Sequence, residues 1–143
     1  MRRIATTVLH ALFLVGLESA AQAGDPPAPA QAETPATTPV IDADQLLSLK
    51  KTQGTELLLL DVRKPEEFAA GHVPGAINIP HDQLASRLAE LPASRDKPVV
   101  VYCRSGRRSA LAEDVLRQGG YTHVQHLKGD MLGWEAEGRP VEK

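Results

Sequence analysis

The sequence predicts an α/β fold in which a central, mostly parallel sheet has helices on both faces. Short runs of consecutive apolar residues alternate along the chain with segments whose apolar residues recur at helical spacing. A continuous apolar run is typical of a strand that is buried on both sides. Strands that alternate with helices favour parallel pairing through right-handed crossovers, so this pattern indicates an α/β class.

The first half of the expected domain contains one strand and three helices. Asp42 and Gln45 are spaced as a capping box, which predicts that a helix begins directly after Asp42. The apolar run at 56–62 predicts a buried strand. A short helix is expected at 65–70, where a proline opens the segment, and another helix is expected at 82–91, where leucines recur at helical spacing.

The second half repeats the alternation. We expect a buried strand at 97–102, a helix at 109–118 that two glycines end, a strand at 122–127 and a short helix at 131–137. Ligands of open α/β sheets bind beyond the carboxyl ends of the strands. Residues that directly follow the strand at 97–102 are therefore the first candidates for a site.

The N-terminal segment predicts export rather than part of the fold. Residues 1–23 contain two arginines, an apolar run and an Ala-Gln-Ala end, which is typical of a cleaved signal peptide. The run at 4–17 is shorter than the roughly 20 apolar residues that cross a bilayer, so we expect no stable membrane anchor. Residues 24–39 read as a linker rich in Pro, Ala and Thr, and 40–143 as one domain of a periplasmic protein.

Composition excludes several partners. The chain has 143 residues, a net charge of −2 and 3% aromatic residues. Its overall charge does not attract nucleic acid or anionic membranes, and so few aromatic residues disfavour the stacking of single-stranded bases. We therefore expect no nucleic-acid partner.

The single cysteine of the chain, Cys103, follows the strand at 97–102 directly. An exported protein with one cysteine has no intramolecular disulfide partner for it, so the thiol is buried and inert, free and reactive, or paired with another molecule. A turn between a strand and a helix points backbone N–H groups and the positive end of the helix dipole at an anion. The candidate binding residues of this turn are Arg104, Ser105, Gly106, Arg107, Arg108 and Ser109.

Such a turn favours the thiolate of Cys103, which is the nucleophilic form of cysteine. An inert core cysteine beside solvated arginines is the alternative, and the density of arginine and glycine in the turn disfavours it. A cysteine phosphatase places its arginine six residues after the nucleophile, whereas that position here is Ser109 and the arginine comes one place early, at Arg108. Thiol–disulfide exchange is disfavoured because the chain lacks a resolving cysteine.

Two blocks of sequence resemble the single-domain rhodaneses, thiosulfate sulfurtransferases, of the exported bacterial kind. They are LLLLDVRKPEEFAAGHVPGAINIP at 57–80 and VVVYCRSGRRSALAEDVL at 99–116, and LKGDMLGW at 127–134 is similar to the closing block of that family. The resemblance spans roughly 40–134 and implies a five-stranded sheet. It departs at Asp130, where a second glycine is often found, and this places the local turn geometry in question more than the chemistry.

The resemblance implies that Cys103 takes the outer sulfur of thiosulfate as a persulfide, releases sulfite and passes the sulfur to cyanide or a thiol. Positive charge for the donor would come from Arg104, Arg107 or Arg108. No metal or organic cofactor is implied, and we expect a monomer. A persulfide carrier that serves a partner protein without rapid turnover is the alternative, because it needs the same thiolate and turn.

Other polar residues have more than one interpretation. Asp61 and Arg63 end a buried strand at the same edge as Cys103, so they are candidates for contact with the donor, although Arg63 could instead pair with Glu66 or Glu67. His72 more simply hydrogen-bonds the chain than acts in catalysis. We interpret Trp134 as an anchor of the core, and three further histidines as structural or surface residues: His81, His123 and His126.

Overall fold

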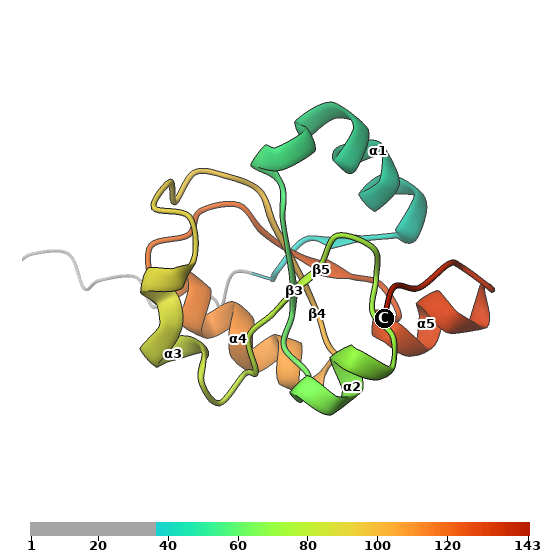
Figure 1. Cartoon of the computed structure of the whole chain (residues 1–143). Helices are drawn as coiled ribbons and strands as arrows, with labels where there is room; N and C mark the ends of the chain where they lie inside the picture. The colour runs from blue at the N-terminus through green and yellow to red at the C-terminus, as the bar shows by residue number, and fades with distance from the viewer. Residues whose placement is uncertain (1–36) are drawn as a thin grey trace, which may run out of the picture. The chain divides into compact units, whose positions relative to one another are not determined.

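The computed structural model describes residues 37–143, which form a five-stranded sheet flanked by helices (Figure 1). The strand order is β1-β5-β4-β2-β3, and every pairing among these strands is parallel. The strands are β1 (Val40–Ile41), β2 (Leu58–Asp61), β3 (Ile77–Asn78), β4 (Val99–Tyr102) and β5 (Val124–Leu127). The helices are α1 (Ala43–Gln53), α2 (Pro65–Ala70), α3 (Leu84–Arg87), α4 (Arg107–Gln118) and α5 (Asp130–Ala136), with short 3-10 turns at Gly54–Glu56 and Leu88–Glu90.

Two apolar cores lie on opposite faces of the sheet because side chains alternate along each strand. In β4, Val99 and Val101 pack with Leu116 of α4 and with α3, whereas Val100 packs with Leu46 of α1 and with α5. Figure 1 shows α3 and α4 on one side of the strands and α1 and α5 on the other. Trp134 of α5 belongs to the second core, as the sequence predicts, and its indole N–H donates to the Pro140 carbonyl at 2.8 Å.

The α/β class and the helices on both faces are confirmed, and the differences from the sequence prediction concern short elements. The patterns predict three strands, and each of them is present. The edge strands β1 and β3 have two residues each, too few for a detectable alternation, and only the family resemblance implied a five-stranded sheet. The helix expected at 82–91 is a single α-helical turn, α3, followed by a 3-10 turn.

One boundary changes the chemistry of the turn after Cys103. Helix α4 begins at Arg107, two residues earlier than predicted, so Arg107 and Arg108 belong to its first turn rather than to the preceding loop.

The predicted capping box of α1 is present, with the Gln45 N–H donating to Asp42 Oδ1 at 2.8 Å and the Asp42 N–H donating to Gln45 Oε1 at 2.8 Å.

The N-terminal predictions fall mostly outside this part of the chain. The signal peptide at 1–23 lies outside the described residues, as does the linker at 24–39 except for its last three residues. The carbonyl of Pro39 accepts a hydrogen bond from the His126 N–H at 2.8 Å, directly before β1. Within residues 37–143, no helix has the length and apolar character that a bilayer crossing requires.

Candidate active site

Cys103 lies at the carboxyl end of β4, between that strand and α4. The parallel register pairs Asp61 with Tyr102, so β2 and β4 end at the same edge of the sheet. The residue is 1% exposed, and its carbonyl accepts a hydrogen bond from the Met131 N–H at 3.0 Å. The backbone on both sides of the sulfur is therefore held by neighbouring elements.

The loop after Cys103 curls back toward the sulfur. Gly106 has a φ of 108°, a left-handed conformation that strains residues with a Cβ, and it is the N-cap of α4. In this conformation the Gly106 N–H donates to Cys103 Sγ at 3.0 Å. The buried Ser109 hydroxyl lies 3.6 Å from the same sulfur. One backbone N–H and one hydroxyl thus approach Sγ at the N-terminus of α4, and an anion-binding role for the loop stays a prediction.

The three arginines of this segment occupy different surroundings. Arg104 and Arg107 are exposed beside the loop, as is Ser105. Arg108 forms two hydrogen bonds with Glu67 of α2, Nη1 to Oε2 at 2.5 Å and Nη2 to Oε1 at 2.9 Å. These bonds lower the pKa of Glu67 to about 2. They also raise the pKa of Arg108, and interaction with Cys103 adds a smaller part of this increase.

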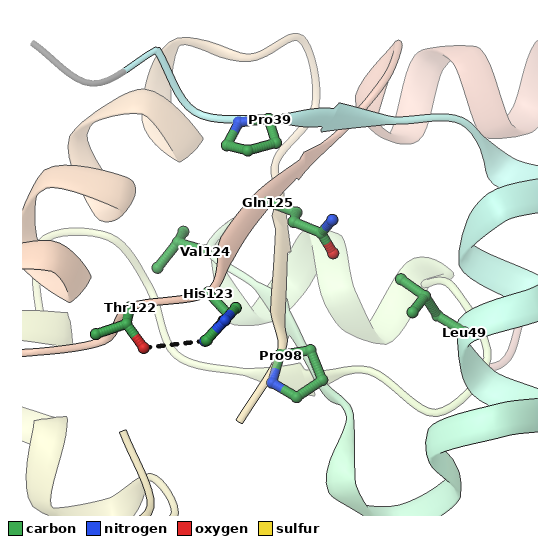
Figure 2. Close-up of a pocket in the computed structure, with 7 residues that line it drawn as sticks. All are labelled: Pro39, Leu49, Pro98, Thr122, His123, Val124 and Gln125. Carbon is green, nitrogen blue, oxygen red and sulfur yellow. Dashed lines mark hydrogen bonds between the residues drawn. The ribbon is translucent and has the colours of Figure 1, made fainter. Parts of the chain in front are cut away.

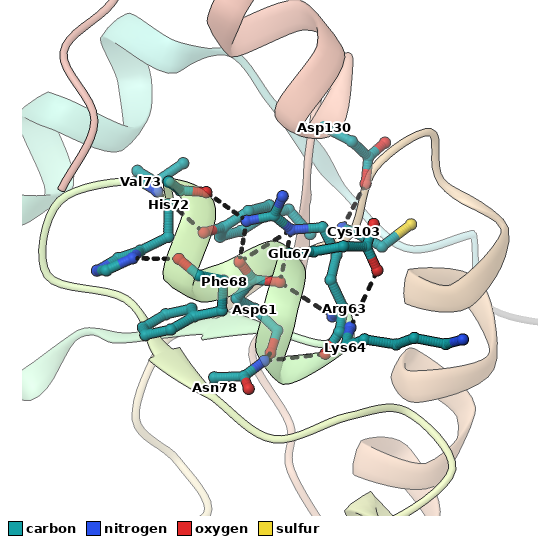
Figure 3. Close-up of polar contacts among 12 residues, drawn as sticks. Asp61, Arg63, Lys64, Glu67, Phe68, His72, Val73, Asn78, Cys103 and Asp130 are labelled. Carbon is teal, nitrogen blue, oxygen red and sulfur yellow. Dashed lines mark hydrogen bonds and ion pairs between the residues drawn. The ribbon is translucent and has the colours of Figure 1, made fainter. Parts of the chain in front are cut away.

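Asp61 and Arg63 form a buried ion pair with each other. Arg63 Nη2 lies 2.7 Å from Asp61 Oδ2 and donates to the Gly71 carbonyl at 2.8 Å, and Arg63 Nε lies 3.0 Å from both Asp61 oxygens (Figure 3). Burial opposes the charge of Arg63, but the hydrogen bonds that Arg63 donates to Asp61 still raise its pKa. The carboxylate partner of Arg63 is thus Asp61 and not Glu66 or Glu67, the two partners that the sequence analysis named. A role for Asp61 and Arg63 in donor binding stays a prediction.

Three residues that sequence reasoning did not assign to the site lie against it. Asp130 Oδ1 accepts a hydrogen bond from the Cys103 N–H at 2.8 Å (Figure 3). It also accepts from the Ser109 hydroxyl at 3.2 Å. Its other oxygen lies 3.0 Å from His126 Nε2, and His126 Nδ1 lies 2.6 Å from Glu113 Oε1. The one available signal was the aspartate at a position where the family often has glycine.

This buried cluster shifts the ionisation of its members. Hydrogen bonds to Asp130 and Glu113 raise the pKa of His126 to about 10, so the imidazole carries a proton at neutral pH. Burial opposes ionisation of Asp130, but the bonds from His126 and the Cys103 amide keep its pKa below the usual value. Of the two interpretations of His126, structural or surface residue, the structure supports the structural one, because its side chain is 16% exposed and ion-paired on both nitrogens.

His72 makes the chain contacts that the sequence analysis favoured for it. Its ring is stacked on Phe68 with centroids 3.6 Å apart, and its Nδ1 lies 2.9 Å from the Phe68 carbonyl oxygen (Figure 3). The phenol of Tyr102 is also buried, which raises its pKa, and it accepts a hydrogen bond from the Val73 N–H at 3.0 Å. These contacts fix the segment between α2 and β3 against the sheet.

A separate cavity of about 310 Å³ lies at the opposite end of the strands (Figure 2). Its lining includes Pro98, which precedes β4, and His123 and Val124 at the start of β5. Ligands of parallel sheets bind at the carboxyl ends of the strands, and this cavity lies at the amino ends. The chemistry of the thiol and its donors therefore places the candidate site at Cys103 and not in this cavity.

Comparisons with known proteins agree with the fold. The rhodanese-like domain family matches residues 42–137. A sulfurtransferase from Allochromatium vinosum is 40% identical over 101 residues, which are 71% of this chain and 92% of the relative. The thiosulfate sulfurtransferase PspE from Escherichia coli is 43% identical over 70 residues, 49% of this chain and 67% of the relative. The structure of the human single-domain sulfurtransferase TSTD1 matches with a TM-score of 0.62 and 31% identity, over 70% of this chain and 97% of that one. The chain therefore belongs to the rhodanese-like domain family, and its sulfurtransferase relatives support an activity of that kind.

Proposed function

We propose that the protein is a thiosulfate sulfurtransferase in which Cys103 carries the transferred sulfur. The observation that carries the proposal is the position of the single cysteine at the N-terminus of α4, where the Gly106 N–H donates to its sulfur at 3.0 Å. The Cys103 thiolate attacks the outer sulfur of thiosulfate. A bond forms between the two sulfurs as the S–S bond of thiosulfate breaks, and sulfite leaves with the electron pair.

The second step regenerates the thiolate. An acceptor, either cyanide or a thiolate, attacks the terminal sulfur of the Cys103 persulfide, and the bonding electrons return to Sγ. Donors around Sγ stabilise the negative charge that develops there, so the Gly106 N–H and the Ser109 hydroxyl favour this departure. No metal or organic cofactor takes part in either step as proposed.

The charge of the donor assigns roles to the arginines. Thiosulfate is a dianion, and the exposed Arg104 and Arg107 border the loop in which it would react. Arg108 is also near Cys103, but its guanidinium donates two hydrogen bonds to Glu67. Arg108 would therefore attract the anionic donor and hold α2 in place at the same time. Bidentate arginine contacts are strong and directional, which suits this double role.

An assay of purified protein tests the function. Intact mass is recorded after incubation with thiosulfate, and thiocyanate is followed after cyanide is added. We expect one sulfur per chain and repeated turnover, loss of both in Cys103→Ala, and weaker use of thiosulfate in Arg108→Ala. Arg87→Ala is the control, because Arg87 at the end of α3 forms a comparable pair with Glu90 of the following 3-10 turn. Gain of one sulfur with negligible turnover would instead support a persulfide carrier, and no gain from any sulfane donor would refute both.

The proposed location is the periplasm. The support is the signal-like pattern of residues 1–23, and export would deliver residues 24–143 as a soluble protein that we propose is a monomer. Expression of the full chain in a bacterium, cell fractionation and N-terminal sequencing test this proposal. We expect the mature protein in the periplasmic fraction with a new N-terminus at Gly24, and an uncleaved cytoplasmic product would refute it.

A further inference from the structure

A buried chain of three charged side chains connects α4, β5 and α5 beneath the cysteine loop. Glu113 and Asp130 approach opposite nitrogens of His126, at 2.6 Å and 3.0 Å. The side chains of Glu113 and Asp130 are 8% and 3% exposed. Buried ionised groups are costly unless each is paired, and here the imidazolium pairs with both carboxylates.

The Asp130 end of this chain contacts the reactive loop. One of its oxygens, Oδ1, accepts from the Cys103 N–H at 2.8 Å and from the Ser109 hydroxyl at 3.2 Å. The other oxygen, Oδ2, lies beneath Gly106, where an added Cβ would come within 3.3 Å of it. The carboxylate thus contacts the start and the end of the loop that surrounds Sγ, and it leaves little room for a side chain at Gly106.

The Ser109 hydroxyl has one proton and three acceptors within reach. It lies 2.9 Å from the Gly106 carbonyl, 3.2 Å from Asp130 Oδ1 and 3.6 Å from Cys103 Sγ. Because His126 binds the other oxygen of Asp130, the carboxylate is held at a fixed distance from this hydroxyl. The direction of the Ser109 proton therefore depends on where Asp130 is held.

The backbone at Asp130 is unfavourable for any residue with a side chain. Its φ is 53°, and within residues 37–143 it is the one residue other than glycine with a positive φ. Aspartate tolerates this region better than most residues, but glycine has no penalty there. A strained conformation that persists beside a reactive loop points to a function of the side chain that it presents.

We propose that Asp130 is a positioning residue for the sulfur transfer, which orients Cys103 and Ser109 through its carboxylate while His126 and Glu113 hold it in place. The inference depends on the proposed function, because it assigns a role in the reaction at Cys103. The carboxylate fixes the Cys103 amide and thereby the position of Sγ, and positioning of a nucleophile can change a rate by roughly a hundredfold.

Two variants at one position separate geometry from charge. Asp130→Gly keeps the turn, because glycine adopts a positive φ without strain, and removes both hydrogen bonds to the loop. Asp130→Asn keeps an acceptor for the Cys103 amide and removes the charge, and its amide N–H can donate to His126 Nε2 once the ring loses its proton at that nitrogen. Asp114→Asn on α4 is the matched control, since that side chain is 63% exposed and pairs with Arg117.

The first measurement is the single-turnover rate of persulfide formation against thiosulfate concentration. We expect Asp130→Gly to lower the maximal rate by roughly tenfold or more, with little change in the half-saturating concentration. Asp130→Asn should stay within about threefold of the wild type, and Asp114→Asn should match it. A Gly variant as fast as the wild type, or an Asn variant as slow as the Gly variant, would overturn the proposal.

The second measurement needs no sulfur donor, so it separates failure of this inference from failure of the proposed function. Residue-level hydrogen exchange by NMR follows the Cys103 amide, whose acceptor is Asp130. We expect this amide to exchange roughly tenfold faster in Asp130→Gly and at nearly the wild-type rate in Asp130→Asn. If the wild type takes no sulfur from thiosulfate, the function fails by the first measurement, and equal protection of Cys103 in all variants overturns the positioning role by the second.

Discussion

The buried imidazole of His126 predicts that the stability of the fold falls as the pH rises above neutrality. Its pKa is about 10 in the folded protein against an ordinary value of 6.5, because Asp130 and Glu113 bind the protonated ring. A folded-state pKa above the unfolded one stabilises the fold fully below pH 6.5, and this stabilisation is lost as the pH rises toward 10. The proton is held by the folded state and released on unfolding.

The magnitude follows from the one proton involved. Between the two pKa values, the folded state binds about one proton more than the unfolded state, so the free energy of unfolding falls by about 1.4 kcal/mol per pH unit. The side chain is 16% exposed, so solvent screens the pair little. Over the whole window, from pH 6.5 to about 10, the loss is about 5 kcal/mol.

Urea denaturation in steps of about one pH unit from 6.5 to about 9.5 measures this slope. Wild type is compared with His126→Gln, which removes the titrating group, and with His123→Gln, which removes an exposed histidine directly before β5. We expect the slope in wild type and in His123→Gln, and a much flatter dependence in His126→Gln. A wild-type free energy that does not fall across the window, or falls equally in His126→Gln, would refute the reasoning.

Three further predictions concern the surroundings of Cys103. Glu67→Gln breaks the pair with Arg108 and should lower the free energy of unfolding by about 1 kcal/mol above pH 4.5. This difference should fade as the pH falls toward 2, because the wild-type carboxylate then becomes protonated. The exposed Glu66→Gln should have little effect in the same urea titrations. Arg63→Ala leaves the Asp61 carboxylate buried without its partner and should lower the free energy of unfolding by about 3 to 5 kcal/mol in chemical denaturation. Arg87→Ala, which breaks a surface pair, should lower it by less than about 1 kcal/mol. Equal losses in the two variants would contradict the structural importance of the buried pair. Gly106→Ala and Gly138→Ala both place a Cβ at a positive φ and should each lose roughly 1 kcal/mol, but only the Gly106 variant, whose Cβ would meet Asp130, should slow persulfide formation in a single-turnover assay. Unchanged sulfur uptake by Gly106→Ala would show that the loop tolerates a shift at this point.

Local patterns were sufficient for most of the fold. The apolar residues of β2 and β4 are all buried, because a strand covered on both faces is mostly apolar, and the buried exception is Asp61 at the end of β2. The capping box of α1 and the proline at the start of α2 are likewise features of residues that are close in sequence. The strand-to-helix turn after Cys103 could be predicted for the same reason.

The sequence by itself determined the α/β class, the place of the thiol and the family, because periodicity, capping residues and a continuous motif are properties of neighbouring residues. Only the tertiary structure decided which partners the charged residues take. Arg108 pairs with Glu67 from a helix 41 positions earlier, and Asp130 meets Cys103 across 27 positions. The edge strands β1 and β3 are also defined by their neighbours, since two residues carry no pattern of their own. Such contacts depend on sheet register and on how helices pack against it, and neither is encoded in any short stretch of the chain.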